Sequence, residues 1–297
     1  MYPRTFHYHR AASLAESASI LAQLGEEARP LAGGQSLIPL MKLRLANPQH
    51  LVDLNFIPNT SYIKEGGGEL RFGAMTRHAE IENSALAMTI PILHDCAAGI
   101  ADVQVRNRGT IGGSVAEADP SGDWAVALAT LDCQIGCIGT NGERSVSLED
   151  FVKDAYTTVL EPGELVKEII VTIPPRGSGG AYLASKRAAP VYASASVAVQ
   201  LAMEGDVCKA AAIALGCVGL TAIRAKDAEG ALRGRAVNEK TVTAAMEAAR
   251  SAADPQSDMR GSADYKRALI AALVKRAVEI AVRRARGEQV EVAPIYA

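Results

Sequence analysis

Two pairs of adjacent glycines, each followed by a helix-like apolar run, are the residues of this sequence with the clearest chemical meaning. Gly33 and Gly34 stand in LAGGQSLIPLM (31–41), and Gly112 and Gly113 stand in RNRGTIGGSVAEADPSGDW (106–124). Glycine between a strand and a helix lets backbone N–H groups approach an anion without an intervening Cβ, and the positive end of the helix adds attraction. A single Gly-Gly is more often an ordinary tight turn, but two such loops in one chain favour phosphate binding.

Neither loop matches a standard nucleotide motif. QSLIPL after Gly34 contains no third glycine of a Rossmann fingerprint, and no Walker lysine follows either pair. A diphosphate held between two separate loops, by backbone groups and the hydroxyls of Ser36, Thr110 and Ser114, is compatible with the sequence. Dinucleotide cofactors carry such a diphosphate.

Other kinds of site find no support in the residue spacing. No serine stands in a nucleophile-elbow context, so no catalytic residue is predicted. The histidines show no metal-ligand spacing, and the cysteines form neither a disulfide framework nor a cluster motif, so no metal site is predicted. These residues are His7, His9, His50, His78 and His94, and Cys96, Cys133, Cys137, Cys208 and Cys217.

Composition limits the class of protein. The 297 residues are enough for two or three domains, and a formal net charge of -2 with scattered basic residues argues against nucleic acid as a partner. No run approaches the roughly 18 uncharged apolar residues of a membrane span, and the amino-terminal residues contain no signal-peptide core. We therefore expect a soluble, cytoplasmic protein without a membrane span.

Periodicity predicts three successive units along the chain. Apolar residues three or four apart predict a helix over 13–24, followed by a strand ending at the first glycines, a helix with Ser36 as its cap, and a strand over 50–54, which is βαβ order. A hairpin around the glycines of 66–68 begins a second unit, and PPRGSGG (174–180) marks a boundary. Strands in 181–187, 192–203 and 207–218, with two amphipathic helices after them, predict an α+β domain. The expected units are 1–60, 61–176 and 177–297.

Seven stretches, in order over nearly the whole chain, resemble one known family. They are FHYHRAASLAES (6–17), ARPLAGGQSLIPLMKLRLANPQHLVDL (28–54), LRFGAMTRHAEIE (70–82), VRNRGTIGGSVAEADPSGDW (105–124), YTTVLEPGELVKEIIVTIPP (156–175), YLASKRAAPVYASASVAV (182–199) and DPQSDMRGSADYKRALIAALVKRAVE (254–279). They are similar to the FAD-binding medium subunit of the molybdenum hydroxylases, the family of carbon monoxide dehydrogenase medium chains and xanthine dehydrogenase FAD subunits. The resemblance implies an α+β chain: two α/β subdomains of the vanillyl-alcohol-oxidase type that hold FAD, then a carboxy-terminal α+β domain with an antiparallel sheet.

The same resemblance implies which residues contact FAD. The first loop would surround the diphosphate from one side and the second from the other, Asp123 would bind a ribose hydroxyl, and Leu165 would lie against the flavin or the adenine. Lys186 and Tyr192 would lie near the flavin ring, where an ammonium stabilises the charge of reduced flavin and an aromatic ring covers one face. The first loop comprises Ala32, Gly33, Gly34, Gln35, Ser36 and Leu37, and the second comprises Thr110, Ile111, Gly112, Gly113 and Ser114.

Three positions depart from the common family pattern. Ser114 and Glu117 stand where asparagine is frequent, although serine keeps a hydroxyl for hydrogen bonding. Gln35 stands where the carbon monoxide enzymes favour histidine, so the carbon monoxide reaction itself is not implied.

The function implied is that of an FAD-binding electron-transfer subunit in a multi-subunit molybdenum hydroxylase. A large subunit would hold molybdopterin, a small one would carry two-iron two-sulfur clusters, and the complex would be a dimer of heterotrimers. Two alternatives stay open at this point: a stand-alone flavin oxidase of the vanillyl-alcohol-oxidase type, and a non-redox nucleotide-binding module.

Overall fold

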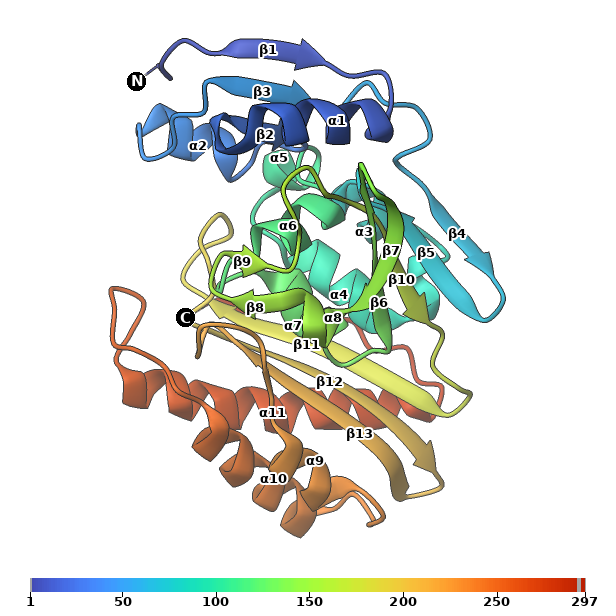
Figure 1. Cartoon of the computed structure of the whole chain (residues 1–297). Helices are drawn as coiled ribbons and strands as arrows, with labels where there is room; N and C mark the ends of the chain where they lie inside the picture. Colours follow the sequence, from blue (N-terminus) through green and yellow to red (C-terminus); the bar gives the residue numbers. More distant parts are fainter. Residues whose placement is uncertain (1, 293–294, 297) are drawn as a thin grey trace.

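Three main β-sheets and one two-stranded pair are found along the chain in the computed structural model, which describes residues 2–292, 295 and 296 (Figure 1). The first sheet lies at the top of Figure 1, the second in the middle and the third at the bottom, each with its own helices. We propose to keep the predicted boundaries at 60/61 and 176/177, because each of the three spans then contains one main sheet. Among the described residues, no helix is long and apolar enough to cross a membrane.

The first unit is a small parallel sheet whose order, β1-β3-β2, confirms the predicted βαβ arrangement. The Ser13 side chain caps its first helix by accepting the N–H of Glu16 at 3.1 Å, and Gly25 ends that helix with φ 56°. The elements are β1 (His7–Arg10), α1 (Leu14–Leu24), η1 (Gly25–Glu27), β2 (Ala28–Leu31), α2 (Leu37–Lys42) and β3 (His50–Asp53).

The second unit is an antiparallel sheet of order β4-β5-β10-β6-β7, with helices packed against it. Gly67 and Gly68, at φ 63° and 80°, make the predicted hairpin turn, because glycine adopts positive φ without strain. Its strands are β4 (Ile63–Gly66), β5 (Glu69–Gly73), β6 (Cys133–Gly139), β7 (Gly142–Ser147) and β10 (Leu165–Thr172), with β8 (Val152–Asp154) and β9 (Thr157–Thr158) as a separate pair. Its helices are α3 (His78–Glu82), η2 (Ala87–Thr89), α4 (Pro91–Gly99), α5 (Val103–Arg106), α6 (Ile111–Glu117), α7 (Asp123–Leu128) and α8 (Leu148–Phe151).

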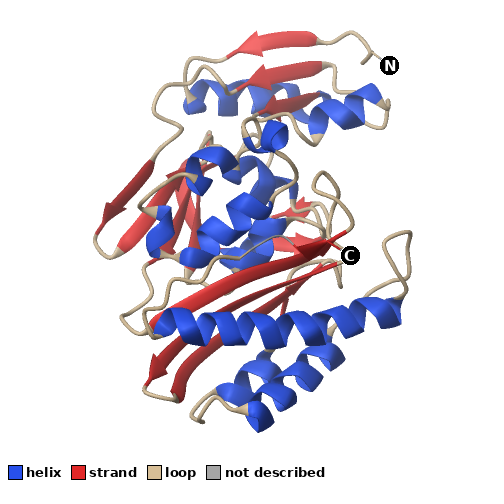
Figure 2. Cartoon of the chain, turned by 180° about the vertical axis from the view of Figure 1, so that it is seen from behind, coloured by secondary structure: helices blue, strands red, loops and turns tan. Residues whose placement is uncertain are grey.

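The third unit confirms the predicted α+β domain. Its sheet, of order β14-β13-β12-β11-β15, is antiparallel except for the pair β11–β15, and EGD joins β12 to β13 as predicted. The long helix α11 lies across the strands (Figure 2). The elements are β11 (Ser178–Lys186), β12 (Ala195–Glu204), β13 (Val207–Gly216), β14 (Ile223–Arg224), α9 (Lys226–Leu232), α10 (Glu239–Ala252), α11 (Ala263–Ala285) and β15 (Ile295–Tyr296).

Both faces of this third sheet are buried, which explains why its strands are almost continuously apolar. Leu183 and Val197 belong to the core beneath α11, whereas Tyr182 and Ala198 belong to the core that includes α4 and α7 of the second unit. Alternate residues of the same strands therefore join the carboxy-terminal domain to the second unit.

A buried ion pair fixes α11 to α4 across this sheet. The two terminal nitrogens of Arg284 lie 2.5 and 2.9 Å from the carboxylate oxygens of Asp95, and the same guanidinium donates to the carbonyl oxygens of Gly180 and Val290 at 2.7 and 2.6 Å. The side chains of Arg284 and Asp95 are 8% and 2% exposed. A buried charge pair is tolerated when its remaining donors are hydrogen-bonded, as they are here.

Candidate functional site

The two glycine loops touch each other directly, although about seventy positions separate them in the sequence. The first lies between β2 and α2, and the second runs from Arg108 through the N-cap Thr110 into the first turn of α6, which contains Gly112 and Gly113. A Cβ atom added to Gly33 would lie 2.3 Å from the carbonyl oxygen of Arg108 and 2.7 Å from the Cα of Gly109. The backbone of the second loop therefore occupies the space that a side chain at position 33 would need.

Gly112 allows the same kind of close approach to the residue that follows β5. A Cβ on Gly112 would lie 2.5 Å from the Cβ of Ala74, just after β5, and the Gly112 N–H donates to the Ala74 carbonyl oxygen at 2.9 Å. The N–H of Ile111 donates to Thr76 at 3.0 Å. The start of α6 is therefore fixed to the second sheet.

Two residues that the sequence analysis did not single out connect the loops by hydrogen bonds. The Arg77 guanidinium donates to the Arg108 carbonyl oxygen of the second loop and, at 2.5 Å, to Oδ1 of Asn55. The Asn55 amide in turn donates to the carbonyl oxygen of Ala32 at 2.8 Å and to Asp53 at 2.6 Å. Arg77 and Asn55 lie far from either loop in the sequence, so no local spacing indicates this role.

The first loop has the donors that an anion needs. Among the residues that the structure describes, no acceptor is found for the backbone N–H groups of 33–37 or for the Ser36 hydroxyl. Ser36 stands at the first position before α2, but its predicted capping bond is absent because its φ and ψ of -99° and -54° are helical rather than extended. A run of unpaired N–H groups at the start of a helix can donate hydrogen bonds to the oxygens of a diphosphate.

The second loop offers fewer backbone donors than the sequence predicts. Besides the bonds of Ile111 and Gly112, the Gly113 N–H donates to the Thr110 hydroxyl at 3.1 Å and the Ser114 N–H to the Thr110 carbonyl at 3.0 Å. For the Ser114 hydroxyl and the Thr110 N–H, the described part of the chain provides no partner. The second loop can therefore present the Ser114 hydroxyl, Gly113 and, from a residue that is 2% exposed, the Thr110 N–H, whereas Gly112 is buried.

The predicted residues Asp123 and Lys186 lie together in a buried cluster. Asp123 Oδ1 accepts the Tyr182 hydroxyl at 2.6 Å and lies 3.9 Å from Lys186 Nζ, which donates to the Gly99 carbonyl oxygen at 2.5 Å. Burial raises the pKa of Asp123, and the nearby Lys186 and the Tyr182 hydrogen bond oppose that rise. Tyr182, missed in the sequence, completes the cluster from β11.

The other predicted site residues lie in different surroundings. Tyr192 is half exposed in the loop between β11 and β12, where burial and the Asp119 carboxylate raise the pKa of its phenol. The Leu165 side chain is buried in the core beneath the first sheet. The exposed Gln35 donates its amide to the Gly33 carbonyl oxygen at 3.3 Å, and Leu37 begins α2.

His78 supports the second loop from inside the protein. Its Nδ1 accepts the indole N–H of Trp124 at 3.1 Å, and its Nε2 would lie 2.7 Å from a Cβ on Gly109. Burial, followed by the charges of Arg77 and Arg106, lowers the pKa of His78 to about 4. The imidazole is therefore neutral at pH 7.

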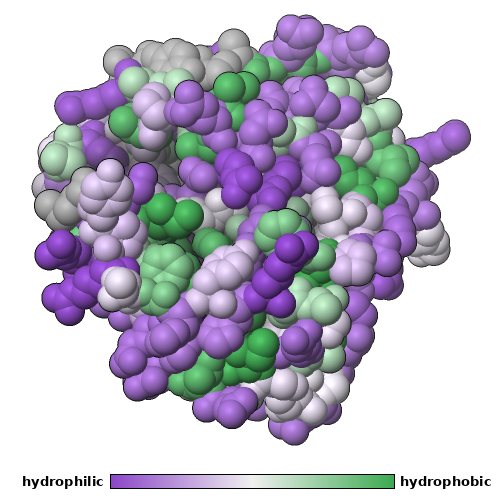
Figure 3. Space-filling model, turned by 90° about the horizontal axis from the view of Figure 1, so that it is seen from above, coloured by the Kyte–Doolittle hydropathy of each residue, from purple (hydrophilic) through white to green (hydrophobic). Residues whose placement is uncertain are grey.

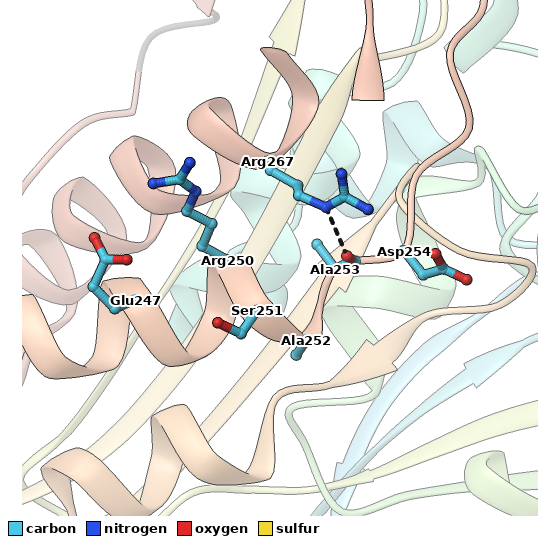
Figure 4. A pocket seen from close by; sticks show the side chains of 7 residues that line it. All are labelled: Glu247, Arg250, Ser251, Ala252, Ala253, Asp254 and Arg267. Carbon is cyan, nitrogen blue, oxygen red and sulfur yellow. Dashed lines mark hydrogen bonds between the residues drawn. The ribbon is translucent and has the colours of Figure 1, made fainter. Parts of the chain in front are cut away.

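A surface cavity of about 520 Å³ lies elsewhere, at the end of α10 (Figure 4). It is lined by Glu247, Arg250, Ser251, Ala252, Ala253, Asp254 and Arg267. Arg267 donates to the Ala253 carbonyl oxygen at 3.3 Å, and none of the predicted site residues takes part. This cavity is separate from the two loops.

The face formed by the first unit, seen from above in Figure 3, mixes hydrophilic and hydrophobic residues. Leu43 and Leu45, just after α2, are 63% and 73% exposed. Isolated exposed leucines are common on protein surfaces and do not by themselves define a binding site.

Two family models match consecutive parts of the chain. An FAD binding domain in molybdopterin dehydrogenase matches residues 4–175, and a CO dehydrogenase flavoprotein C-terminal domain matches residues 180–281. The carbon monoxide dehydrogenase medium chain of Afipia carboxidovorans is 42% identical, over 96% of this chain and 100% of its own length. Subunit alpha of the 6-hydroxypseudooxynicotine dehydrogenase complex of Paenarthrobacter nicotinovorans is 37% identical, over 96% and 97%.

Solved structures agree with these matches. A carbon monoxide dehydrogenase chain from Hydrogenophaga pseudoflava superimposes with a TM-score of 0.93 at 41% identity, covering 96% of this chain and 99% of that one. A chain of quinoline 2-oxidoreductase from Pseudomonas putida 86 superimposes with a TM-score of 0.91 at 37% identity, with the same coverage of 96% and 99%. The predicted fold class is confirmed.

Replacing the contact glycines should separate the loops. We expect Gly33→Ala and Gly112→Ala to lower the free energy of unfolding by about 1–3 kcal/mol, because each Cβ would overlap the opposing loop or strand. FAD retained after gel filtration should fall with it. Gly230→Ala in α9 is the matched control, because its Cβ would meet nothing within 4 Å, so it should be neutral or stabilising by about 0.5–1 kcal/mol. Parent-like stability and flavin content in both loop variants would show that the contact is unimportant.

The buried His78 should make the protein acid-sensitive. The folded-state pKa of about 4 lies below the unfolded value of 6.5, so this stability is complete above pH 6.5 and is lost as the pH falls toward 4. The difference between these two pKa values corresponds to a loss of about 3 kcal/mol, because one pKa unit equals about 1.4 kcal/mol. Urea unfolding between pH 7 and 4.5 should therefore show a shallower decline in His78→Gln than in the parent. His94→Gln is the control, because Asp95 raises the pKa of His94, so that this histidine contributes to stability with the opposite pH dependence. Equal slopes in the parent and His78→Gln would contradict this account.

Proposed function

Because the chain belongs to the family of FAD-binding medium subunits of the molybdenum hydroxylases, we propose that it is the electron-transfer subunit of such a complex. Electrons would enter from iron-sulfur clusters of a small partner subunit and leave FAD for an external acceptor. A large partner subunit would hold the molybdopterin centre. The three different subunits would form a heterotrimer, and two heterotrimers would pair in the cytoplasm. The relatives named as a medium chain and as a subunit of a dehydrogenase complex support this assignment, since the chain covers nearly their full lengths.

The observation that carries the proposal is the direct contact of the two glycine loops beside a run of unpaired backbone donors. The N–H groups of 33–37 and the Ser36 hydroxyl would bind the FAD diphosphate from one side, and the Thr110 N–H and the Ser114 hydroxyl from the other. FAD would supply the redox chemistry, storing two electrons and releasing them to the acceptor. The protein would bind and orient it, and no side chain of this chain would need to be a general acid or base.

The remaining predicted residues would contact parts of FAD other than the diphosphate. Asp123 has one carboxylate oxygen engaged by Tyr182, which would leave the other for a ribose hydroxyl. Lys186 would place a buried positive charge near the ring, where it favours the reduced flavin, and Tyr192 would cover one face. The side chain of Leu165 is buried, so only its backbone in β10 would be available to FAD.

The substrate of the complex would be chosen in another subunit. Proteins named for carbon monoxide, quinoline and 6-hydroxypseudooxynicotine share this fold at 37% to 42% identity with the chain. Proteins that act on such different molecules contain one kind of chain, so this chain would not determine the choice of substrate. Gln35, in the first loop, gives no reason to prefer carbon monoxide.

Purification of the chain together with the products of its neighbouring genes tests this proposal. We expect a complex with about one FAD per copy of this chain, together with molybdenum and iron, and flavin reduction when substrate is added, because the flavin would lie within electron-transfer reach of a cluster. The chain by itself should oxidise no substrate. A colourless chain within an intact complex would contradict the FAD role, and substrate turnover by the chain alone would favour the stand-alone oxidase.

A further inference from the structure

The loop between α10 and α11 reaches the predicted flavin-contacting segments from a third part of the chain. It comprises residues 253–262 and is tied to the carboxy-terminal sheet where the Asp254 N–H donates to the Val218 carbonyl oxygen at 2.9 Å. One of its residues, Arg260, extends toward the segment before α7 and the segment before β12. Nothing in the sequence analysis assigned a role to Arg260.

Arg260 contacts both of those segments at once. Its Nη1 donates to the Ser121 hydroxyl at 2.9 Å and to the Ala193 carbonyl oxygen at 3.4 Å. Its carbonyl oxygen accepts the Ser194 hydroxyl at 2.9 Å, and its guanidinium carbon lies 6.0 Å from the centre of the Tyr192 ring. Ser121 is two residues before Asp123, so Arg260 bridges the neighbours of two predicted FAD contacts.

The orientation of Arg260 is itself fixed. The Asp258 carboxylate accepts the Arg260 N–H at 2.8 Å and lies 3.3 Å from Nε. Lys266, whose side chain is 4% exposed, lies 2.9 Å from the same carboxylate and donates to the Gln256 carbonyl oxygen at 2.8 Å. A guanidinium held in this way presents its remaining N–H groups in a rigid fork, which a flexible ammonium would not do.

The segment that carries Tyr192 has few other restraints. Residues 187, 188 and 190–192 are exposed, and the first firm backbone bond after them joins the Ser194 N–H to the Ser185 carbonyl oxygen at 2.8 Å. Exposed segments with few hydrogen bonds open at low free energy. The contacts of Arg260 therefore restrain the backbone on the carboxy-terminal side of Tyr192 relative to Ser121, while the Asp119 carboxylate interacts with the Tyr192 hydroxyl itself.

We propose that Arg260 is a positioning residue that clamps the Tyr192 segment to the Ser121 segment and thereby holds the Tyr192 ring in place over the flavin. The clamp is a property of the chain itself. Its consequence for the flavin rests on the proposed function, so the two are tested by separate measurements.

Trypsin cleavage after the exposed Arg187 measures the clamp in the full chain without FAD. Local opening controls cleavage, so Arg260→Gln should be cut there about tenfold faster than the parent, and Arg260→Lys about threefold faster, because lysine keeps the charge without the fork. Arg250→Gln is the matched control: Arg250 is exposed on α10 and should leave the rate unchanged. Mass spectrometry identifies the cleavage site. Cleavage of Arg260→Gln at the parent rate would overturn the proposal.

The purified complex measures the consequence for the cofactor. Release of FAD from Arg260→Gln should be about tenfold faster than from the parent, because an ordered contact slows dissociation. The flavin absorption band of this variant should shift toward that of free FAD. Arg260→Lys should show smaller changes in both measurements. A parent complex that lacks FAD would refute the proposed function, whereas the cleavage rates would still decide the clamp. If circular dichroism shows Arg260→Gln to be unfolded, Ser121→Ala replaces it, since it removes one acceptor and keeps the arginine. Unchanged cleavage in Ser121→Ala would then overturn the clamp.

Discussion

The contact between Gly33 and the backbone of Arg108 and Gly109 is the constraint on which the rest of the site depends. It brings the first and second units together where no side chain could fit, since even a methyl group would lie 2.3 Å from a carbonyl oxygen. Arg77 and Asn55 join the same two loops by hydrogen bonds, and His78 packs beneath Gly109. The unpaired N–H groups of the first loop are thereby held at a fixed place beside α6.

The carboxy-terminal domain is packed tightly against the second unit, which contains the second loop. Because alternate side chains of β11 and β12 pack on opposite faces, Tyr182 and Ala198 join the domain to the second unit, while Leu183 and Val197 pack against its own helices. The Arg284–Asp95 pair fixes the same junction. Lys186, at the end of β11, consequently reaches Asp123 at the start of α7. A cofactor bound by the loops would therefore contact three parts of the chain.

The features that the sequence predicted are those determined by short stretches of the chain. The βαβ order, the hairpin at Gly67 and the EGD turn all follow from periodicity and turn chemistry, and all are found. Asn55, Arg77, Tyr182 and Arg260 were missed because their roles arise from contacts across tens to more than a hundred positions. Ser36 shows the reverse error: its residue type predicts a cap, but its helical backbone angles direct the hydroxyl elsewhere. The bare Gly33, interpreted from sequence as room for a phosphate, is instead the room that the second loop occupies.

The central claim is that both loops bind one diphosphate, the first mainly through backbone N–H groups and the second mainly through Ser114 and Thr110. A crystal or cryo-electron-microscopy structure of the complex with FAD measures this directly. The account predicts diphosphate oxygens within hydrogen-bond distance, about 2.7–3.2 Å, of N–H groups in residues 33–37 and also of the Ser114 hydroxyl or the Thr110 N–H. A diphosphate that contacts only one loop, or neither, would contradict it.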